Sequence, residues 1–556
     1  PFYRQFSRSL PAKPTALLFF LREIWYTIKH RDKRSLASVW RYGVKKILKF
    51  LLSRTFLFGL LIACQVGLFA ALMLVFSRAG TAAYIILTLV SVLVVIAVIE
   101  RDNINPAYKI MWLLIVVALP VTGAVFYLWW GNQGVTPKNA RKFADIERAA
   151  SAAMVQDDAV TEALYAREPA FRRSVEYLSR NASAPLYCNT QSEYYPMGQD
   201  FFARFLEVIR GAKKYIFMEY FIIDRGYMWD SILEVLRQKA AEGVEVRVMY
   251  DGMCCLMLLP YHYPQKLENM GIRCQMFSPI KPVLSTHQNY RDHRKVTVID
   301  GHTAFTGGVN LADEYINRKE RFGHWKDTAI MIKGDAVKSF TMMFLQMWNA
   351  FALEKDKLDY EKFCLEDVRP LAKEERGIVL PYSDHPLDSE FVGESVYINL
   401  INSAQKYIYF FTPYLIIDNE VVTALILAAK RGVDVRIITP GIPDKKMIFL
   451  VTQSYYPQLV EGGVQIFQYR PGFVHAKCAV CDDKIATVGT INLDYRSLYL
   501  HFENGLFLYN NDTVMDIKKD ILDTLEDCNR IMPEMCKKNM FFLLLQGILR
   551  IFAPLL

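Results

Sequence analysis

A short pattern of chemically active residues occurs twice in this chain, in two copies that lie 182 residues apart. Each copy has a histidine, a lysine two residues later and an aspartate five residues after that: His293-Arg-Lys295-Val-Thr-Val-Ile-Asp300 and His475-Ala-Lys477-Cys-Ala-Val-Cys-Asp482. A turn of small residues and an asparagine follow in each copy: Gly307-Gly308-Val-Asn310 and Gly489-Thr490-Ile-Asn492. From ordinary residue frequencies, about 0.02 accidental matches to the three-residue pattern are expected. The repeat therefore indicates two related domains that complete one site together.

The duplication extends beyond the motif. Residues 212–223 and 404–417 are strand-like runs, each followed by a helical segment and then by Gly-Val-x-Val-x-Ile/Val at 243–250 and 432–438. A helix that ends at glycine before such a strand is typical of a parallel βαβ unit. We therefore predict an α/β fold with two pseudo-two-fold-related domains, whose paired motifs meet in one cleft.

The chain is long enough for several domains. We expect a basic N-terminal arm at 1–54, membrane helices within 55–132, a helical connector at 133–183 and a first α/β domain at 184–353. A linker at 354–389, a second α/β domain at 390–530 and a C-terminal helix at 531–556 complete the predicted order.

The spacing within each motif predicts where its side chains point. Alternate residues of a strand share a face, so His293 and Lys295 should face the same space, as should His475 and Lys477. The aspartates of the motif have the opposite parity and belong to the following turn. We count Asp300 and Asp482 among the candidate catalytic residues of the motif, but expect them to be structural rather than in contact with substrate.

The predicted convergent set holds two imidazoles, two ammonium groups and two carboxamides, the last from Asn310 and Asn492. It suits a phosphodiester whose transition state gathers negative charge on oxygen. One histidine can attack phosphorus while the other serves as acid and base. The lysines supply positive charge, so we expect no metal and no cofactor. An acid should orient each imidazole: Glu503 is the candidate in the second half and Asp327 its counterpart in the first, with simple surface charges as the alternative.

Charge is distributed unevenly. Residues 1–54 hold 13 Lys and Arg against Glu23 and Asp32, whereas the whole chain has a net charge of +9. The rest of the chain is thus close to neutral, which argues against a nucleic-acid partner. The basic arm suits anionic lipid headgroups, either as an amphipathic helix over residues 14–29 or as a flexible tail.

Three apolar stretches, at about 55–77, 82–99 and 110–130, explain the hydrophobic fraction of 52%. Their length predicts membrane helices, and the basic arm before them predicts a cytoplasmic N-terminus. Loop charges leave open which membrane face carries the site. The apolar run 540–556 has 17 residues and includes Arg550, so it fits an interfacial helix or a groove wall better than a span.

The chain resembles the phospholipase D superfamily in its two motifs and in Asn492-Leu-Asp-Tyr-Arg-Ser497, and more narrowly the bacterial cardiolipin synthases. The segments whose sequences are close to those of that family are 291–301, 412–415, 472–477 and the membrane segment that begins at Asn105-Pro-Ala-Tyr. The resemblance covers about residues 82–509. It does not cover the basic arm or the extra first apolar stretch. The resemblance therefore does not determine the membrane topology.

The resemblance implies two phospholipase D-like domains with mixed sheets, in a multi-pass protein of the bacterial cell membrane. It implies transfer of a phosphatidyl group between two phosphatidylglycerols, giving cardiolipin and glycerol through a phosphatidyl-histidine. We expect His293 as the nucleophile and His475 as the acid and base. A hydrolytic phospholipase D, or a synthase with another acceptor alcohol, is the main alternative; a nuclease and a catalytically inert scaffold are further ones. Homo-oligomer formation stays open.

Overall fold

The computed structural model describes residues 79–101, 105–131, 137–154, 172–277, 290–352, 356–364 and 377–555, together with positions 63, 67, 71, 161, 162 and 166. The basic arm at 1–54 and nearly all of the first apolar stretch at 55–77 lie outside these residues. The chain divides into two compact units, one made of residues 1–100 and 113–127, the other of residues 101–112 and 128–556.

The second and third predicted membrane stretches are helical, but the third is broken. Its residues are divided among α5 (Pro106–Ala118), α6 (Pro120–Phe126) and a short π-helix (Tyr127–Gly131), whereas the second lies within α4 (Ala79–Ile99). Pro120 ends the continuity because proline lacks a backbone N–H and restricts the residue before it. Among the residues described, no helix is both long and apolar enough to cross a membrane.

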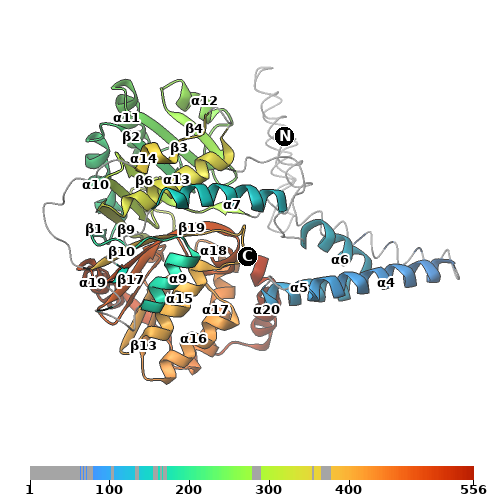
Figure 1. Cartoon of the computed structure of the whole chain (residues 1–556). Helices are drawn as coiled ribbons and strands as arrows, with labels where there is room; N and C mark the ends of the chain where they lie inside the picture. Colours follow the sequence, from blue (N-terminus) through green and yellow to red (C-terminus); the bar gives the residue numbers. More distant parts are fainter. Residues whose placement is uncertain are drawn as a thin grey trace, which may run out of the picture. The chain divides into compact units, whose positions relative to one another are not determined.

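The second unit contains two mixed sheets, one in each half (Figure 1), and their strands follow the same order. The first sheet runs β1-β9-β7-β6-β2-β3-β4. Its strands are β1 (Thr190–Tyr195), β2 (Tyr215–Tyr220), β3 (Glu245–Asp251), β4 (Arg273–Phe277), β6 (Lys295–Ile299), β7 (Thr303–Gly307) and β9 (Ala329–Gly334). The first half also holds α7 (Pro137–Ala152), α10 (Gly198–Arg210), α11 (Tyr227–Ala241), α12 (Tyr263–Glu268), a 3-10 turn η3 (Asp313–Ile316), α13 (Val337–Phe351) and α14 (Tyr360–Cys364).

The second sheet repeats this order as β10-β19-β17-β16-β11-β13-β14 and adds β20 at its edge. These strands are β10 (Ile378–Asp384), β11 (Tyr407–Phe411), β13 (Asp434–Pro440), β14 (Gln465–Tyr469), β16 (Cys478–Cys481), β17 (Ile485–Gly489), β19 (His501–Tyr509) and β20 (Cys528–Arg530). The helices of this half are α9 (Arg172–Asn181), α15 (Val392–Ser403), α16 (Asn419–Lys430), α17 (Lys446–Glu461), α18 (Tyr495–Tyr499), α19 (Thr513–Glu526) and α20 (Met540–Ile551), with 3-10 turns η5 (Pro533–Cys536) and η6 (Ala553–Leu555).

The predicted duplication is therefore confirmed, including its local signals. Gly243 and Gly432 follow α11 and α16 with φ of 90° and 92°, a left-handed conformation that glycine adopts without steric cost. Each leads into a strand, β3 or β13, that pairs in parallel with its neighbour β2 or β11.

Two of the predicted boundaries differ from the structure. Residues 378–384, within the predicted linker, form β10, which pairs along its whole length with β19 and so belongs to the second sheet. Helix α9, within the predicted connector, packs Val175 and Leu178 into the core of the second half. Both segments are far in sequence from the residues that they contact in the second half. Local sequence patterns therefore do not predict these contacts.

One hydrophobic core joins the two halves. Phe217 and Val298 from the first sheet, and Phe411 and Val480 from the second, belong to the same buried cluster, which also includes residues of α13 and α19. Separate clusters lie between the first sheet and α10 and α11, and between the second sheet and α15, α16 and α17. The shared core fixes the two motif strands relative to each other.

Short strands also cross between the halves. Strand β5 (Arg291–Asp292) pairs in parallel with β19, and β15 (Gly472–Val474) pairs in parallel with β8 (His324–Lys326). A further two-residue pair, β12 (Leu415–Ile416) with β18 (Leu493–Asp494), lies within the second half. The two crossings end directly at the two motif histidines.

Candidate active site

Both motif histidines lie where a short strand of one half meets the other half. His293 follows β5, and its backbone N–H donates to the carbonyl oxygen of Phe502 at 2.9 Å. His475 follows β15, and its N–H donates to the carbonyl oxygen of Lys326 at 2.7 Å. The main chain therefore holds each imidazole beside a strand from the opposite domain.

The two carboxylates predicted to orient the histidines do contact them, but with the partners exchanged. Nδ1 of His293 lies 2.9 and 3.0 Å from the two carboxylate oxygens of Glu503, and Nδ1 of His475 lies 2.7 Å from Oδ2 of Asp327. The prediction that each acid orients the histidine of its own half is therefore wrong. The exchange follows from the crossing strands, which place His293 next to β19 and His475 next to the end of β8.

This contact determines the tautomer of each ring. An ionised carboxylate only accepts hydrogen bonds, so each Nδ1 is the donor and Nε2 keeps its lone pair. Burial lowers the pKa of His475 to about 4, with help from the nearby Lys477 ammonium. Burial and the charges of Lys295 and Lys477 also hold the pKa of His293 well below its usual value. These lowered pKa values favour the neutral form of both rings at pH 7.

The carboxylates are themselves held in place. Burial opposes ionisation of Asp327, yet His475 and Lys477 bring its pKa below the usual value, and its Oδ1 accepts the N–H of Thr328 at 2.9 Å. The Thr490 hydroxyl donates to Oε2 of Glu503. Both carboxylates are fully buried, so neither can turn away from its imidazole without losing these bonds.

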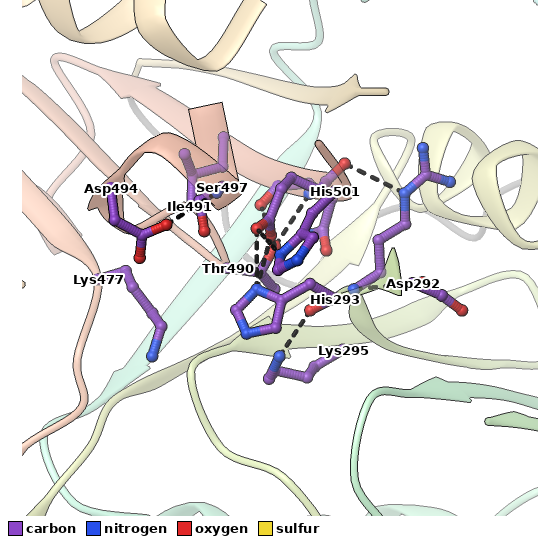
Figure 2. Close-up of polar contacts among 12 residues, drawn as sticks. Asp292, His293, Lys295, Lys477, Thr490, Ile491, Asp494, Ser497 and His501 are labelled. Carbon is purple, nitrogen blue, oxygen red and sulfur yellow. Dashed lines mark hydrogen bonds and ion pairs between the residues drawn. The ribbon is translucent and has the colours of Figure 1, made fainter. Parts of the chain in front are cut away.

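The motif lysines share the faces of their histidines, as predicted. Nζ of Lys295 donates to the carbonyl oxygen of His293 at 2.6 Å, and Nζ of Lys477 donates to the corresponding oxygen of His475. Each lysine is 1% exposed. Burial lowers the pKa of Lys295 to about 8 and that of Lys477 to about 7. Figure 2 shows both ammonium groups near the His293 ring.

The motif aspartates bind backbone N–H groups rather than the motif histidines, so the prediction that they belong to the catalytic residues is wrong. Asp300 accepts the backbone N–H groups of residues 213–215 at 2.7–2.9 Å, and Asp482 accepts those of residues 405–407 at 2.6–2.8 Å. Both have positive φ, 53° and 52°, in the turn after the motif strand. They clamp the start of β2 and β11, in agreement with their predicted parity.

The two asparagines both line the cavity, with different partners. Oδ1 of Asn310 accepts the N–H of Ile222 at 3.0 Å, and its Nδ2 donates to the Tyr315 hydroxyl at 2.8 Å. Oδ1 of Asn492 is buried and has no hydrogen-bond partner in the described part of the chain. The spare atom of Asn492 is an acceptor, so it suits a hydroxyl group of a ligand rather than a phosphate oxygen.

A cavity of about 620 Å³ opens between the halves and joins these groups. Residues of both halves line it, among them His293, Asn310, His475 and Asn492. Aromatic rings surround the His475 end: the ring centroids of Tyr315 and Trp325 lie 5.4 and 5.5 Å from that of His475. The cavity can take a phosphodiester with apolar substituents.

One polar residue of the cavity escaped prediction. His501 begins β19, two residues before Glu503 and therefore on the same face, and its ring centroid lies 5.4 Å from that of His293 (Figure 2). Burial lowers its pKa to about 3, and neither ring nitrogen has a hydrogen-bond partner among the described residues. The His-Phe-Glu sequence contains the signal, because residues two apart on a strand share a face.

His293, His501 and Glu503 also present ligating atoms within 4.8 Å of one another, a spacing that a metal ion could bridge. A metal there would replace the bond that orients His293. The cationic lysines beside the same ring oppose such binding, since like charges repel across a few ångströms.

Comparison with known proteins supports the interpretation of this geometry. The family "Cardiolipin synthase, PLD-like domain" matches residues 205–348 and 397–524, and the family "Phospholipase_D-nuclease N-terminal" matches residues 83–132. The first match falls on both halves of the duplicated unit.

Individual relatives agree with this assignment. A Streptococcus mutans protein described as uncharacterized is 46% identical, over 80% of this chain and 96% of its own length. A cardiolipin synthase of Alkalihalophilus pseudofirmus is 33% identical over 84% of this chain and 92% of its own length. The crystal structure of a phosphatidylserine synthase from Haemophilus influenzae covers 69% of this chain and 97% of its own length at 17% identity, with a TM-score of 0.54, and so supports the fold. The two motif histidines line one cavity, and a cardiolipin synthase is 33% identical over 84% of the chain, so the chain belongs to the cardiolipin synthase family of phospholipase D-like proteins.

Proposed function

We propose that this protein is a cardiolipin synthase, a phosphatidyltransferase that converts two phosphatidylglycerols to cardiolipin and glycerol. The observation that carries the proposal is the pair of oriented imidazoles, one from each half, that line the same cavity. A single phospholipase D-like half holds one such imidazole, whereas exchange of an alcohol on phosphorus needs a nucleophile and an acid.

The substrate phosphate would bind near the ammonium groups of Lys295 and Lys477, with the Asn492 oxygen free to accept a headgroup hydroxyl. Two buried ammonium groups match a phosphodiester anion and the charge that gathers on its non-bridging oxygens in the transition state. Binding the anion also favours the protonated forms of the nearby imidazole and lysines, because opposite charges stabilise each other in a buried site. No step of the reaction requires a metal.

In the first step, Nε2 of His293 attacks the phosphorus of one phosphatidylglycerol. A phosphorus–nitrogen bond forms, the bond to the headgroup oxygen breaks, and His475 donates a proton to that oxygen so that glycerol leaves. Glu503 supports the positive charge that develops on His293, as a carboxylate does for a catalytic imidazole. Exchanging the roles of the two histidines would leave the balance of atoms unchanged.

In the second step, His475 accepts the proton of a headgroup hydroxyl on a second phosphatidylglycerol. The oxygen attacks phosphorus, the bond to His293 breaks, and cardiolipin forms while His475 regains its proton. Asp327 holds His475 in the tautomer that both transfers require. Water in place of the lipid alcohol would give phosphatidic acid, which is the hydrolytic alternative.

The lipid substrate calls for membrane association. We propose a multi-pass protein of the bacterial cell membrane with a cytoplasmic N-terminus; the basic arm and the apolar composition of residues 55–130 support it. Helix α20 supports an additional interfacial contact. Its one buried residue is Gln546, which donates to the Leu450 carbonyl at 3.1 Å, while most of its large apolar side chains, Phe541 and Leu544 among them, are exposed.

Purified full-length protein in phosphatidylglycerol vesicles tests the activity. We expect release of glycerol in step with formation of cardiolipin, and loss of both products in His293→Ala and in His475→Ala. Phosphatidic acid as the sole lipid product would show a hydrolase instead.

A further inference from the structure

The apolar rim of the cavity has no role in the reaction proposed above, yet it occurs in both halves. In the first half, the segment after β3 contains Met253, which lines the cavity, followed by Leu256, Met257 and Tyr261. The exposed fractions of the last three are 45%, 75% and 78%. Side chains this large and apolar are seldom so exposed next to one another on a soluble surface.

The second half repeats the arrangement at the equivalent place. The segment after β13 contains Ile442, 40% exposed, and Met447, 51% exposed, and the next residue, Ile448, lines the cavity. Strands β3 and β13 occupy corresponding positions in the two sheets. The duplicated fold thus places an exposed apolar segment at each side of the same opening.

Basic side chains accompany the second segment. Lys445 lines the cavity, and its side chain is 66% exposed. Lys446 follows it at the start of α17 and is also exposed. An ammonium group beside an apolar surface suits the boundary between anionic headgroups and acyl chains, where lysine can leave its stem among apolar groups and its charge in the headgroup layer.

We propose that the segments 253–261 and 442–447 form a bilayer-docking rim, which inserts its apolar side chains into an anionic membrane so that lipid passes into the cavity without crossing water. The inference rests on the proposed function and specifies where the substrate enters. Continuity with the catalytic cavity, occurrence in both halves and the adjacent lysines together select a lipid surface as the occupant. A protein partner would have no need of an opening to the phosphate site.

Hydrogen–deuterium exchange measures docking directly in the full-length protein. In nanodiscs that contain phosphatidylglycerol, amides of residues 253–261 and 442–449 should exchange at least threefold more slowly than in nanodiscs of phosphatidylcholine alone. Equal exchange of both segments in the two lipids would overturn the proposal. This readout does not depend on turnover, so it separates failure of the rim from failure of the synthase assignment, which would appear as absence of cardiolipin from the wild type.

Charged substitutions give the second test. Met257→Glu and Met447→Glu should each raise the KM for vesicular phosphatidylglycerol about tenfold, since each removes one partly inserted apolar side chain. Met515→Glu, on α19 and 48% exposed, is the matched control and should leave KM within twofold. Thermal unfolding of each variant reports folding; if one variant is unstable, the other and the exchange experiment still decide. A KM that is unchanged in both rim variants would contradict the proposal.

Discussion

Glu503 holds His293 by two contacts of 2.9 and 3.0 Å, although the two residues belong to different halves and are 210 positions apart. Asp327 and His475 form the reciprocal pair across the same boundary, 148 positions apart. Each half therefore contributes the imidazole of one pair and the carboxylate of the other. Separation of the halves would disorient both histidines at once.

Loss of the charge at position 503 should reduce catalysis without unfolding the protein. Glu503→Gln keeps the size of the side chain but no longer stabilises an imidazolium at His293, so we expect kcat to fall by about 10²–10⁴-fold, as for the acid of a catalytic triad. Asp327→Asn should act similarly through His475. Glu461→Gln, an exposed carboxylate at the end of α17, is the control and should retain full activity. Cardiolipin formation and thermal unfolding together check this; normal turnover in Glu503→Gln would show that its contact with His293 is dispensable.

The pairing of each histidine with the carboxylate of the other half could not be predicted from the sequence. The repeat, its glycines and the period of two along a strand were enough to predict two domains, a shared cleft and the division between His293 and Asp300. The crossing strands β5 and β15 were not predictable, because they have two and three residues and no periodic pattern. Their register alone decides that Glu503 lies beside His293 rather than His475.

Strand β10 was missed for a related reason. It is an edge strand of seven residues that includes Pro381, and it follows a charged segment, so composition favoured a linker. Its place is determined by pairing with β19, more than a hundred residues later in the chain. His501 was missed because its meaning depends on Glu503 two residues away. The position of β10 depends on a distant segment, which local patterns do not encode, whereas that of His501 follows from strand parity within β19.

The buried lysines predict an alkaline limit to activity. The pKa of Lys477 is lowered to about 7 and that of Lys295 to about 8, whereas an unburied lysine titrates near pH 10.4. As pH rises through 7–8, the free enzyme loses the charges that attract the phosphate, so kcat/KM should fall over this range. Lys477→Arg should move this alkaline fall in kcat/KM to higher pH, because a guanidinium stays protonated. The pH dependence of kcat/KM on phosphatidylglycerol vesicles measures the shift. If kcat/KM falls over the same pH range in the wild type and in the variant, Lys477 is not the titrating group.

The motif aspartates should matter for stability rather than for chemistry. The Asp482 carboxylate accepts three backbone N–H groups before β11, and an amide accepts them less strongly. We expect Asp482→Asn to lower the free energy of unfolding by about 2 kcal/mol while the rate per folded molecule stays close to wild type. Asp523→Asn, an exposed position on α19, should change neither quantity. Thermal unfolding and active-site titration separate the two effects; a large loss of kcat at unchanged stability would assign Asp482 to the chemistry.

Gly308 offers a test of how closely the His475–Asp327 pair must fit. A Cβ atom at this position would lie 2.0 Å from Oδ1 of Asp327, closer than real Cβ atoms approach, and 3.0 Å from the carbonyl oxygen of His475, which is a tight contact. Gly308→Ala must therefore displace the Asp327 carboxylate from Nδ1 of His475. We expect at least a hundredfold loss of kcat, because His475 is then no longer held in the orientation that proton transfer requires. Gly547→Ala in α20, where a Cβ meets nothing within 4 Å, is the matched control and should stabilise its helix slightly if it has any effect. Kinetics and a crystal structure of Gly308→Ala check the displacement. Full activity in that variant would mean that the 2.7 Å contact between Asp327 and His475 tolerates disruption, and that the acid and base role does not depend on it.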